Sequence, residues 1–395
     1  MDNNAKFILK SGKDQSVKRY HPWIFSGAIK KSFGNLIEGE VVDVYDNKDN
    51  FLARGHYQIG SISIRVLSFE PTEIDYSFYK LKLQIAWNLR QRLLENMPET
   101  NVYRLIHGEG DNLPGLIIDI YNDTAVVQMH SVGMFLVRED IAKALQEISN
   151  GSIQHIYCKS AATLPKKALE DEQKDMFLLG DKESGIVQEY GVKYEINWIQ
   201  GQKTGFFVDQ RENRKLVGQY SKNRKVANVF GYTGGFSLFA MQNGAEIVHT
   251  VDSSAKAIDL TDQNVVLNFG ENHSHKGIVA DAFDFFANAE DTYDLIILDP
   301  PAFAKHHNVL SNALQGYKRI NQRAFENIEP DGILFTFSCS QAVSPQNFRK
   351  SVFAAAANAG RKVRILHQLT QPSDHPVSIY HPEGEYLKGL VLHVE

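Results

Sequence analysis

The sequence predicts an α/β protein in which two smaller regions precede a doubly wound, mainly parallel sheet. From about Val187 onward, apolar strand-like runs alternate with helical segments, as in repeated βαβ units. Before this region, residues 1–72 show short runs with the partial period-two alternation of strands, and residues 73–187 mix strand-like and helix-like patterns. Because 395 residues exceed the usual size of one hydrophobic core, we expect three domains, at 1–72, 73–187 and 188–395.

The first region is expected to be a small β-barrel-like module that ends near Pro71-Thr72. Its strands are separated by Gly and Asn and are predicted at 41–45, 51–56 and 61–67. The middle region is expected to be α+β. Its helices are predicted at 76–95 and 133–148, and its strands at 113–121, 124–129 and 153–158. The charged, weakly patterned stretch 163–182 is interpreted as a linker or excursion.

The last region supplies the doubly wound sheet. Its strands are predicted at 226–230, 246–251, 277–280, 295–298, 333–337 and 387–394, and its helices at 235–243, 255–269, 313–328 and 345–359. Ligands of such sheets bind at the carboxyl ends of the strands, near the point where the strand order reverses. Residues that directly follow each strand are therefore the candidate site residues.

Composition narrows the class of protein. Hydrophobic residues make up 43% and charged residues 23%, which is typical of a globular chain. No apolar run approaches the roughly 20 residues that cross a bilayer, and no apolar segment follows Met1 to Lys6, so we expect a cytoplasmic protein without membrane contact. Only Cys158 and Cys339 are present, which excludes a disulfide framework, and no zinc-binding pattern occurs, so no metal is expected.

A glycine-rich turn follows the first strand of the predicted sheet. Its glycines, Gly231, Gly234 and Gly235, are spaced G-x-x-G-G, and Tyr232 lies between them. The dinucleotide fingerprint G-x-G-x-x-G, which serves a pyrophosphate, is absent. The turn is thus better suited to a cofactor without a pyrophosphate, although an ordinary βα turn would read the same way.

Two aspartates follow the next two strands. Asp252 is placed to accept hydrogen bonds from ribose hydroxyls, and Asp281 to receive an adenine amino group. Either residue could instead cap the helix that follows it. Together with the glycine turn, they indicate a nucleoside cofactor.

The fourth and fifth strands are followed by Asp299-Pro300-Pro301 and by Cys339 within Ser338-Cys339-Ser340. Two prolines stiffen the loop that carries the carboxylate. A thiol beside a helix that starts near Ser344 can have a lowered pKa. A buried small residue is the alternative reading of Cys339, and Cys158 is interpreted as a packing residue.

A basic stretch occupies the N-terminus, where seven Lys and Arg residues between Met1 and Lys31 face only two aspartates. Lys18, Arg19 and Trp23 combine cations, which can meet phosphates, with an aromatic ring, which can stack on bases. Taken alone, this stretch is as well explained by a solvated basic face with a buried Trp.

Several of these segments resemble the motifs of class I methyltransferases. More specifically, the chain resembles the bacterial and archaeal family of 23S ribosomal RNA 5-methylcytosine methyltransferases with an N-terminal PUA domain. The most specific segments are 202–214, 299–301, 338–340, 374–376 and 382–389. The resemblance implies a PUA module, a central α+β domain and a Rossmann-like catalytic domain. It also implies a homodimer, S-adenosylmethionine as cofactor and large-subunit ribosomal RNA as substrate.

The resemblance also implies residue roles. Cys339 would add to carbon 6 of cytosine and Asp299 would hold or protonate N3; the base that removes the carbon 5 proton is not identified. RNA binding falls to Lys18, Arg19 and Trp23. The implied cofactor residues are Tyr232, Gly234, Asp252, Asp281, Asp299, Asp209 and Arg211.

Three alternatives stay open at this point. A guanine N-methyltransferase would need no cysteine nucleophile, but Ala302 stands where that class usually has an aromatic residue after Asp-Pro-Pro. A non-catalytic RNA-binding protein is disfavoured by the intact run of strand-end residues. A nicotinamide-dependent oxidoreductase is disfavoured by the glycine spacing.

Overall fold

The computed structural model describes residues 4–165, 169, 172–271, 273–289, 291–303 and 310–395. By internal contacts the chain forms two compact units. The first consists of Met1–Val187, Ile196–Val208 and Ser373–Gly384, and the second of Gln188–Glu195, Asp209–Pro372 and Glu385–Glu395. Both of the smaller predicted regions thus lie in the first unit, and the three domain boundaries themselves stay a prediction.

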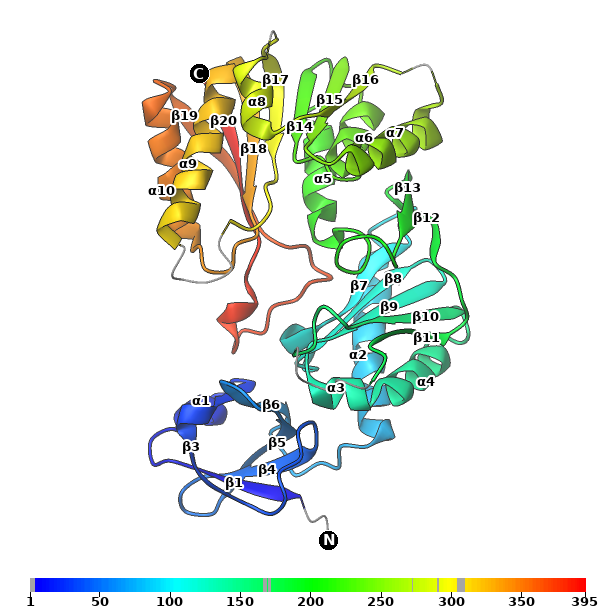
Figure 1. Cartoon of the computed structure of the whole chain (residues 1–395), viewed down its shortest axis with the longest axis vertical. Coiled ribbons are helices and arrows are strands. Elements are labelled where there is room, and N and C mark those ends of the chain that lie inside the picture. The colour runs from blue at the N-terminus through cyan, green and yellow to red at the C-terminus, as the bar shows by residue number, and fades with distance from the viewer. Residues whose placement is uncertain (1–3, 166–168, 170–171, 272, 290, 304–309) are drawn as a thin grey trace. The chain divides into compact units, whose positions relative to one another are not determined.

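The N-terminal part of the first unit is a six-stranded sheet with the order β2-β6-β5-β4-β1-β3 (Figure 1). Among the described residues of this sheet, β1 and β4 are the one pair that runs parallel. Its core contains Phe7, Leu9, Val44 and Ile64. The elements are β1 Ala5–Leu9, α1 Gln15–Lys18, β2 Trp23–Phe25, β3 Ile29–Phe33, β4 Val41–Tyr45, β5 Phe51–Tyr57 and β6 Ile62–Ser68.

The middle part of the first unit is a five-stranded sheet, β11-β10-β9-β8-β7, packed with helices. The linker predicted at 163–182 is wrong in part, because β11 lies within it and pairs antiparallel with β10; residues 166–168 and 170–171 are outside the described residues. The helix predicted at 133–148 is interrupted at Val137. The elements are α2 Tyr76–Leu94, β7 Val102–His107, β8 Leu116–Tyr121, β9 Thr124–Met129, α3 Val132–Leu136, α4 Arg138–Ile148, β10 His155–Lys159 and β11 Asp175–Leu179.

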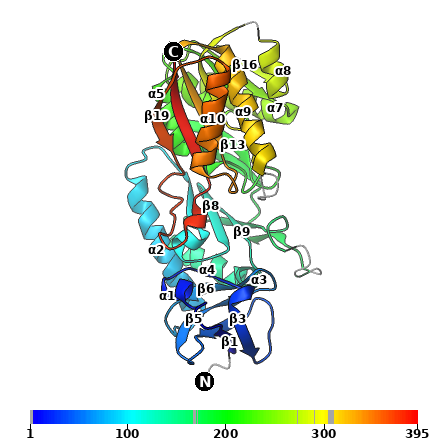
Figure 2. The same ribbon diagram turned by 90° about the vertical axis from the view of Figure 1, so that its left-hand side faces the viewer.

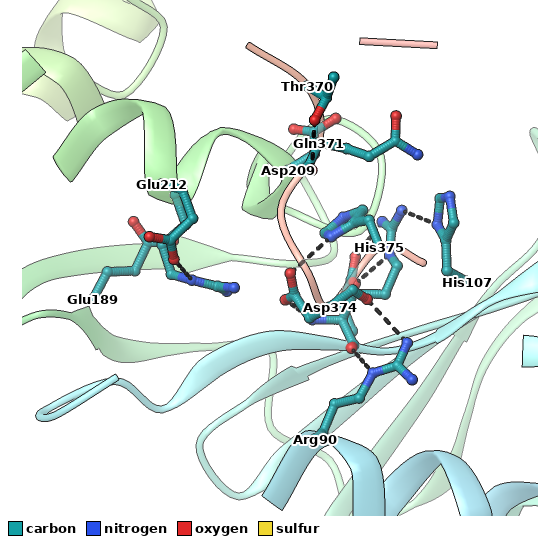
Figure 3. Close-up of polar contacts among 12 residues, drawn as sticks. Arg90, His107, Glu189, Asp209, Glu212, Thr370, Gln371, Asp374 and His375 are labelled. Atoms are coloured by element: carbon teal, nitrogen blue, oxygen red, sulfur yellow. Dashed lines mark hydrogen bonds and ion pairs between the residues drawn. The ribbon is translucent and has the colours of Figure 1, made fainter. Parts of the chain in front are cut away.

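A short C-terminal segment, Ser373–Gly384, completes the first unit. The fully buried Arg90 of α2 donates to both carboxylate oxygens of Asp111, at 2.6 and 2.7 Å, and to the carbonyl of Asp374 at 2.9 Å. The Asp374 carboxylate in turn accepts from the Arg104 amide at 2.9 Å. It also contacts the ring of His375 (Figure 3). The segment that resembles the family's tail is therefore anchored by buried hydrogen bonds from Arg90 and from the Arg104 amide.

The second unit contains a seven-stranded sheet with the order β16-β15-β14-β17-β18-β20-β19 (Figure 1). The predicted doubly wound architecture is confirmed: the strands β14 to β18 pair in parallel, and β20 runs antiparallel to both of its neighbours, β18 and β19. The strands are β14 Lys225–Val229, β15 Ile247–Asp252, β16 His275–Val279, β17 Tyr293–Leu298, β18 Ile328–Ser338, β19 Val363–Leu369 and β20 Lys388–Val394. A two-stranded sheet, β12 Ser184–Glu189 and β13 Val192–Asn197, precedes them.

Helices cover both faces of this sheet (Figures 1 and 2). Alternate residues of each central strand point to opposite faces: Leu295 and Ile297 join the core under α5 and α6, whereas Ile296 and Leu298 join the core under α8, α9 and α10. A strand buried on both faces must be apolar throughout, which explains why β17 was predictable. The helices are α5 Arg211–Gln219, α6 Gly235–Gln242, α7 Ala255–Phe269, α8 Ala282–Ala287, α9 Leu310–Asn327 and α10 Pro345–Asn358.

The strand order reverses between β14 and β17, which is the topological switch point. The carboxyl ends of the strands meet there in register: Val229 lies opposite Val251 and Leu298, and Leu298 lies opposite Thr336. The residues that follow these strands therefore share one edge of the sheet. Within the described part of the chain, no helix is both long and apolar enough to cross a membrane.

Candidate functional site

The glycine turn after β14 is tightly built. Gly234 has φ +78°, and a Cβ atom there would lie 2.6 Å from Cγ2 of Thr261. Gly231 is equally constrained, since its Cβ would lie 2.2 Å from Cγ2 of Thr250. The non-glycine residues Phe230 and Tyr232 also have positive φ, 65° and 49°. Strained backbone of this kind persists where the surroundings hold it, and such positions cluster at ligand sites.

Asp252 ends β15 and fastens the glycine turn to the helix that follows. Its Oδ2 accepts from the backbone N–H of Tyr232 at 3.0 Å, and its Oδ1 accepts from that of Ser254 at 2.9 Å. An ionised carboxylate has about four acceptor positions, so two further hydrogen bonds remain possible. The half-buried side chain can thus both hold the turn and receive two hydroxyl groups.

Asp281 lies at the end of the adjacent β16 and is exposed. Its side chain accepts from the backbone N–H of Phe283 at 2.8 Å and caps α8. The capping alternative is thus real, and it leaves the other carboxylate oxygen available. Beside it, Val279 is 56% exposed, an apolar surface next to an acceptor that suits one face and one edge of a base.

Asp299 follows β17, next to the switch point, and is the carboxylate most altered by its surroundings. Burial and the negative charge of Asp209 raise its pKa to about 7, against a hydrogen bond from Gln210 and the charge of Arg214. Only its Oδ2 is engaged by a described residue, by Nε2 of Gln210 at 3.0 Å. The carboxyl group therefore keeps its proton to a higher pH than an ordinary aspartate does, and one of its oxygens remains for another molecule.

A hydrogen-bond chain positions Asp299 and Asp209. Asn213 donates to Gln210 at 2.6 Å, which orients the Gln210 amide so that its nitrogen faces Asp299. Tyr386 donates to Oδ2 of Asp209 at 2.6 Å, while Oδ1 of Asp209 is buried without a hydrogen bond. Such an unsatisfied acceptor is costly unless a donor binds there. Gln210, Asn213 and Tyr386 were not predicted as site residues, because their role appears only once these segments meet.

Arg211 is fully buried and ion-paired with Glu212 at 3.3 Å. Next along α5, Arg214 forms a buried bidentate pair with Glu189, at 2.7 and 2.8 Å. A Cβ on Gly235 would lie 2.9 Å from Cδ of Arg214, so this arginine supports the glycine turn. The two cations thus lie in the interior behind the turn.

Cys339 follows β18, the strand paired with β17, so the structure brings it to the same sheet edge as Asp299. Its side chain is half-buried and is not in a disulfide bond. The residues on either side are fully buried and tied to α9: the Ser338 hydroxyl donates to the Tyr317 hydroxyl at 2.9 Å, and that hydroxyl contacts Ser340 at 2.9 Å. The loop that carries the thiol is therefore held rigidly.

Lys388 begins β20 and was not predicted as a site residue. It pairs with Ser338 across the two strands, is 9% exposed, and donates to the carbonyl of Ser340 at 2.7 Å. Burial lowers its pKa to about 8, and a negative charge on Cys339 opposes that shift. A lone lysine at the start of an apolar strand is the signal that could have found it.

The predicted RNA-binding residues lie in the first unit. Lys18 is neutralised by Asp14 and Asp46, and the Trp23 indole N–H donates to Glu109 at 2.7 Å. Arg19 is exposed. Of the two predicted cations, Arg19 is therefore the one without a described ion pair. Trp23 has a structural contact within the first unit, and RNA binding by these residues stays a prediction.

A group of possible metal ligands lies beside Trp23. Donor atoms of His21, His381 and Glu383 are all within 4.8 Å of one another, and the rings of Trp23 and His381 are 4.3 Å apart. No sequence pattern indicated this group, since its members are far apart along the chain. It lies in the first unit, not among the strand-end residues of the second.

Comparison with known proteins accords with this geometry. A model of the S-adenosylmethionine-dependent methyltransferases matches residues 169–383, and a model of the PUA-like domain matches residues 7–69. The chain is 39% identical over 391 residues to the ribosomal RNA large subunit methyltransferase I of Tolumonas auensis, with 97% of this chain and 98% of that protein covered.

Solved structures share the whole fold. A proposed SAM-dependent methyltransferase from Streptococcus mutans superposes with a TM-score of 0.83 at 23% identity, covering 98% of this chain and 99% of that one. A methyltransferase crystallised in complex with SAH has a TM-score of 0.84 at 23% identity, with the same coverage.

Proposed function

Because the chain belongs to the S-adenosylmethionine-dependent methyltransferase family and carries a PUA-like domain, we propose that it methylates carbon 5 of a cytosine in large-subunit ribosomal RNA. The proposed substrate rests on relatives named as ribosomal RNA large subunit methyltransferases. The proposed position on the base rests on one observation: a half-buried thiol, Cys339, and a carboxyl group of raised pKa, Asp299, follow neighbouring strands at the switch point.

The cofactor is S-adenosylmethionine, and the residues at the sheet edge fit it. Asp252 has acceptor capacity for ribose hydroxyls, and Asp281 with Val279 offers an acceptor and an apolar face for adenine. The unsatisfied Oδ1 of Asp209 could receive the positively charged methionine part of the cofactor. Tyr232 and Gly234 belong to the tight turn that lets the backbone approach the cofactor closely. Arg211 is fully buried and would support the site without contacting the cofactor.

The chemistry at carbon 5 follows from the thiol. Carbon 5 of cytosine is weakly nucleophilic; when the Cys339 thiolate bonds to carbon 6, the electrons of the 5,6 double bond become available at carbon 5. When bound, S-adenosylmethionine would supply an electrophilic methyl group to that carbon and leave as S-adenosylhomocysteine. Loss of the carbon 5 proton to a base then restores the double bond and expels the Cys339 thiolate.

Asp299 would manage charge on the ring during the addition. Addition at carbon 6 pushes negative charge toward N3, and a protonated carboxyl group can donate a hydrogen bond or a proton there. With a pKa of about 7, a large part of Asp299 is protonated at neutral pH. Its free Oδ1 is the oxygen that would meet the base.

Guanine N-methylation is the weaker reading. That class stacks its base on an aromatic residue after Asp-Pro-Pro, whereas Ala302 stands here. The next aromatic ring, that of Phe303, packs against Tyr317 with 4.8 Å between centroids and joins the core around α9.

A homodimer stays a prediction, which sedimentation velocity can check.

The test is Cys339→Ala with ribosomal RNA as substrate. We expect loss of 5-methylcytosine by mass spectrometry while S-adenosylmethionine binding is retained. RNA carrying 5-fluorocytidine should trap a covalent complex with the wild type and none with the variant, because fluorine cannot leave as a cation. Cys158→Ala is the matched control, since Cys158 is fully buried and burial raises its pKa to about 11. Methylation retained by Cys339→Ala would refute the covalent mechanism.

A further inference from the structure

We infer that Lys388 is the positioning cation of Cys339: its ammonium group fixes the loop that carries the thiol and stabilises the thiolate form. This assignment deepens the proposed function and rests on it for its catalytic meaning. The geometry behind it is independent of any substrate.

The strand pairing sets the geometry. Lys388 lies opposite Ser338 in the β18–β20 ladder, and its Nζ donates to the carbonyl of Ser340 at 2.7 Å. One lysine thus contacts the chain on both sides of Cys339. Because β20 runs antiparallel to β18, the first residue of β20 meets the last residues of β18, where the thiol loop begins.

Burial of the Lys388 ammonium group costs free energy unless a negative charge compensates for it. Lys388 is only 9% exposed. Among the described residues, its ammonium group donates to one carbonyl and forms no ion pair with a carboxylate. A buried ammonium normally needs a compensating negative charge. The thiolate of Cys339 is such a charge, and its attraction raises the lysine pKa as burial lowers it.

Other ionisable groups near the thiol do not replace Lys388. On α9, Tyr317 feels the Cys339 charge, and its own pKa is raised by burial, so it stays a neutral hydrogen-bonding group. Directly after β17, Asp299 would oppose a thiolate when it is ionised. On α10, Arg349 and Lys350 are exposed. Among the described residues, Lys388 is therefore the buried cation at this loop.

The experiment measures the alkylation rate of Cys339 by iodoacetamide against pH, in a Cys158→Ala background and without RNA or cofactor. Lys388→Met should raise the apparent pKa of Cys339 by about one unit or more, so that alkylation near pH 7 slows about tenfold. Lys388→Arg, which keeps the charge, should restore most of the rate. Lys225→Met is the matched control. Lys225 lies at the amino end of β14, far from the carboxyl ends of the parallel strands where the thiol loop lies, and it pairs with Asp291.

An unchanged alkylation profile in Lys388→Met would overturn the inference. If that variant does not fold, the reciprocal measurement decides: Cys339→Ser should lower the pKa of Lys388 in competitive acetylation, and no shift would overturn the inference too. Neither readout depends on methylation. Failure of the proposed function would instead appear as 5-methylcytosine formed by Cys339→Ala.

Discussion

At the level of single residues, Asp299 shows how a site can cost stability. Its pKa is about 7 in the folded chain, well above the ordinary value of 3.8. The folded state therefore binds the proton more tightly than the unfolded state does. Stability contributed by this group is full below about pH 4 and is lost as the pH rises toward 7.

Asp299→Asn removes that penalty together with the proton. We expect its melting temperature to exceed that of the wild type at pH 8 and to match it near pH 4, as followed by circular dichroism. Methylation should fall by about 10²- to 10⁴-fold, the usual worth of a general acid. A variant that is less stable than the wild type at pH 8 would show that the raised pKa is not the dominant effect at this site.

The residues that could be predicted were those that follow apolar strands. Asp252, Asp299 and Cys339 each stand at the end of an apolar run. The pattern of apolar residues therefore located the strand ends at which they lie. Lys388 and Gln210 could not be found in this way, because the importance of Lys388 depends on the pairing of β20 with β18, and that of Gln210 on its contact with the distant Asp299. Pairing between distant segments leaves little trace in a single sequence.

Among the elements, the glycine turn after β14 depends on close packing against α7. Gly234→Ala would combine a positive φ of 78° with a Cβ placed 2.6 Å from Thr261. We expect the turn to shift, weakening S-adenosylmethionine binding about tenfold or more by calorimetry, since the turn also carries Tyr232, which Asp252 holds. Gly360→Ala shares the positive φ, 68°, but meets open space, and should bind the cofactor normally.

The strands of the large sheet that are buried on both faces were predicted, and so was its edge strand β16, whereas the edge strands β11 and β19 were not. In β19, side chains alternate between half-buried and exposed, and Val363–Leu369 includes Arg, His and Gln, so its apolar signal is diluted. β11 is half-buried throughout and lies in a charged stretch, which made it read as a linker. In both cases the sheet supplies hydrogen-bond partners that the local sequence does not announce.

For the molecule as a whole, Arg90 is the residue on which the first unit's closure depends. Replacing it with Met would leave Asp111 buried without its partner and would release the carbonyl of Asp374. We expect Arg90→Met to reduce the free energy of unfolding by about 3–5 kcal/mol in urea denaturation. Arg92→Met, two residues along the same helix and exposed, should change it by no more than about 0.5 kcal/mol. Equal effects of the two would mean that the buried pair is not what holds the segment.

The division of the chain into two compact units could not be predicted, because the chain does not complete one unit before beginning the next. Thr204, far along the chain from Asp119, donates to its carboxylate at 2.6 Å within the first unit. A linear reading of composition assigns both Ile196–Val208 and Ser373–Gly384 to the last region, since nothing in their local sequence marks the crossing.

This interleaving has a consequence for anyone who would cut or recombine the protein. A gene fragment that stops after Val187 omits two of the three pieces of its own unit, so it should yield aggregated material rather than a portable folded module. Grafting this unit onto another enzyme would require insertion of the catalytic portion as a guest within it, not a simple end-to-end fusion.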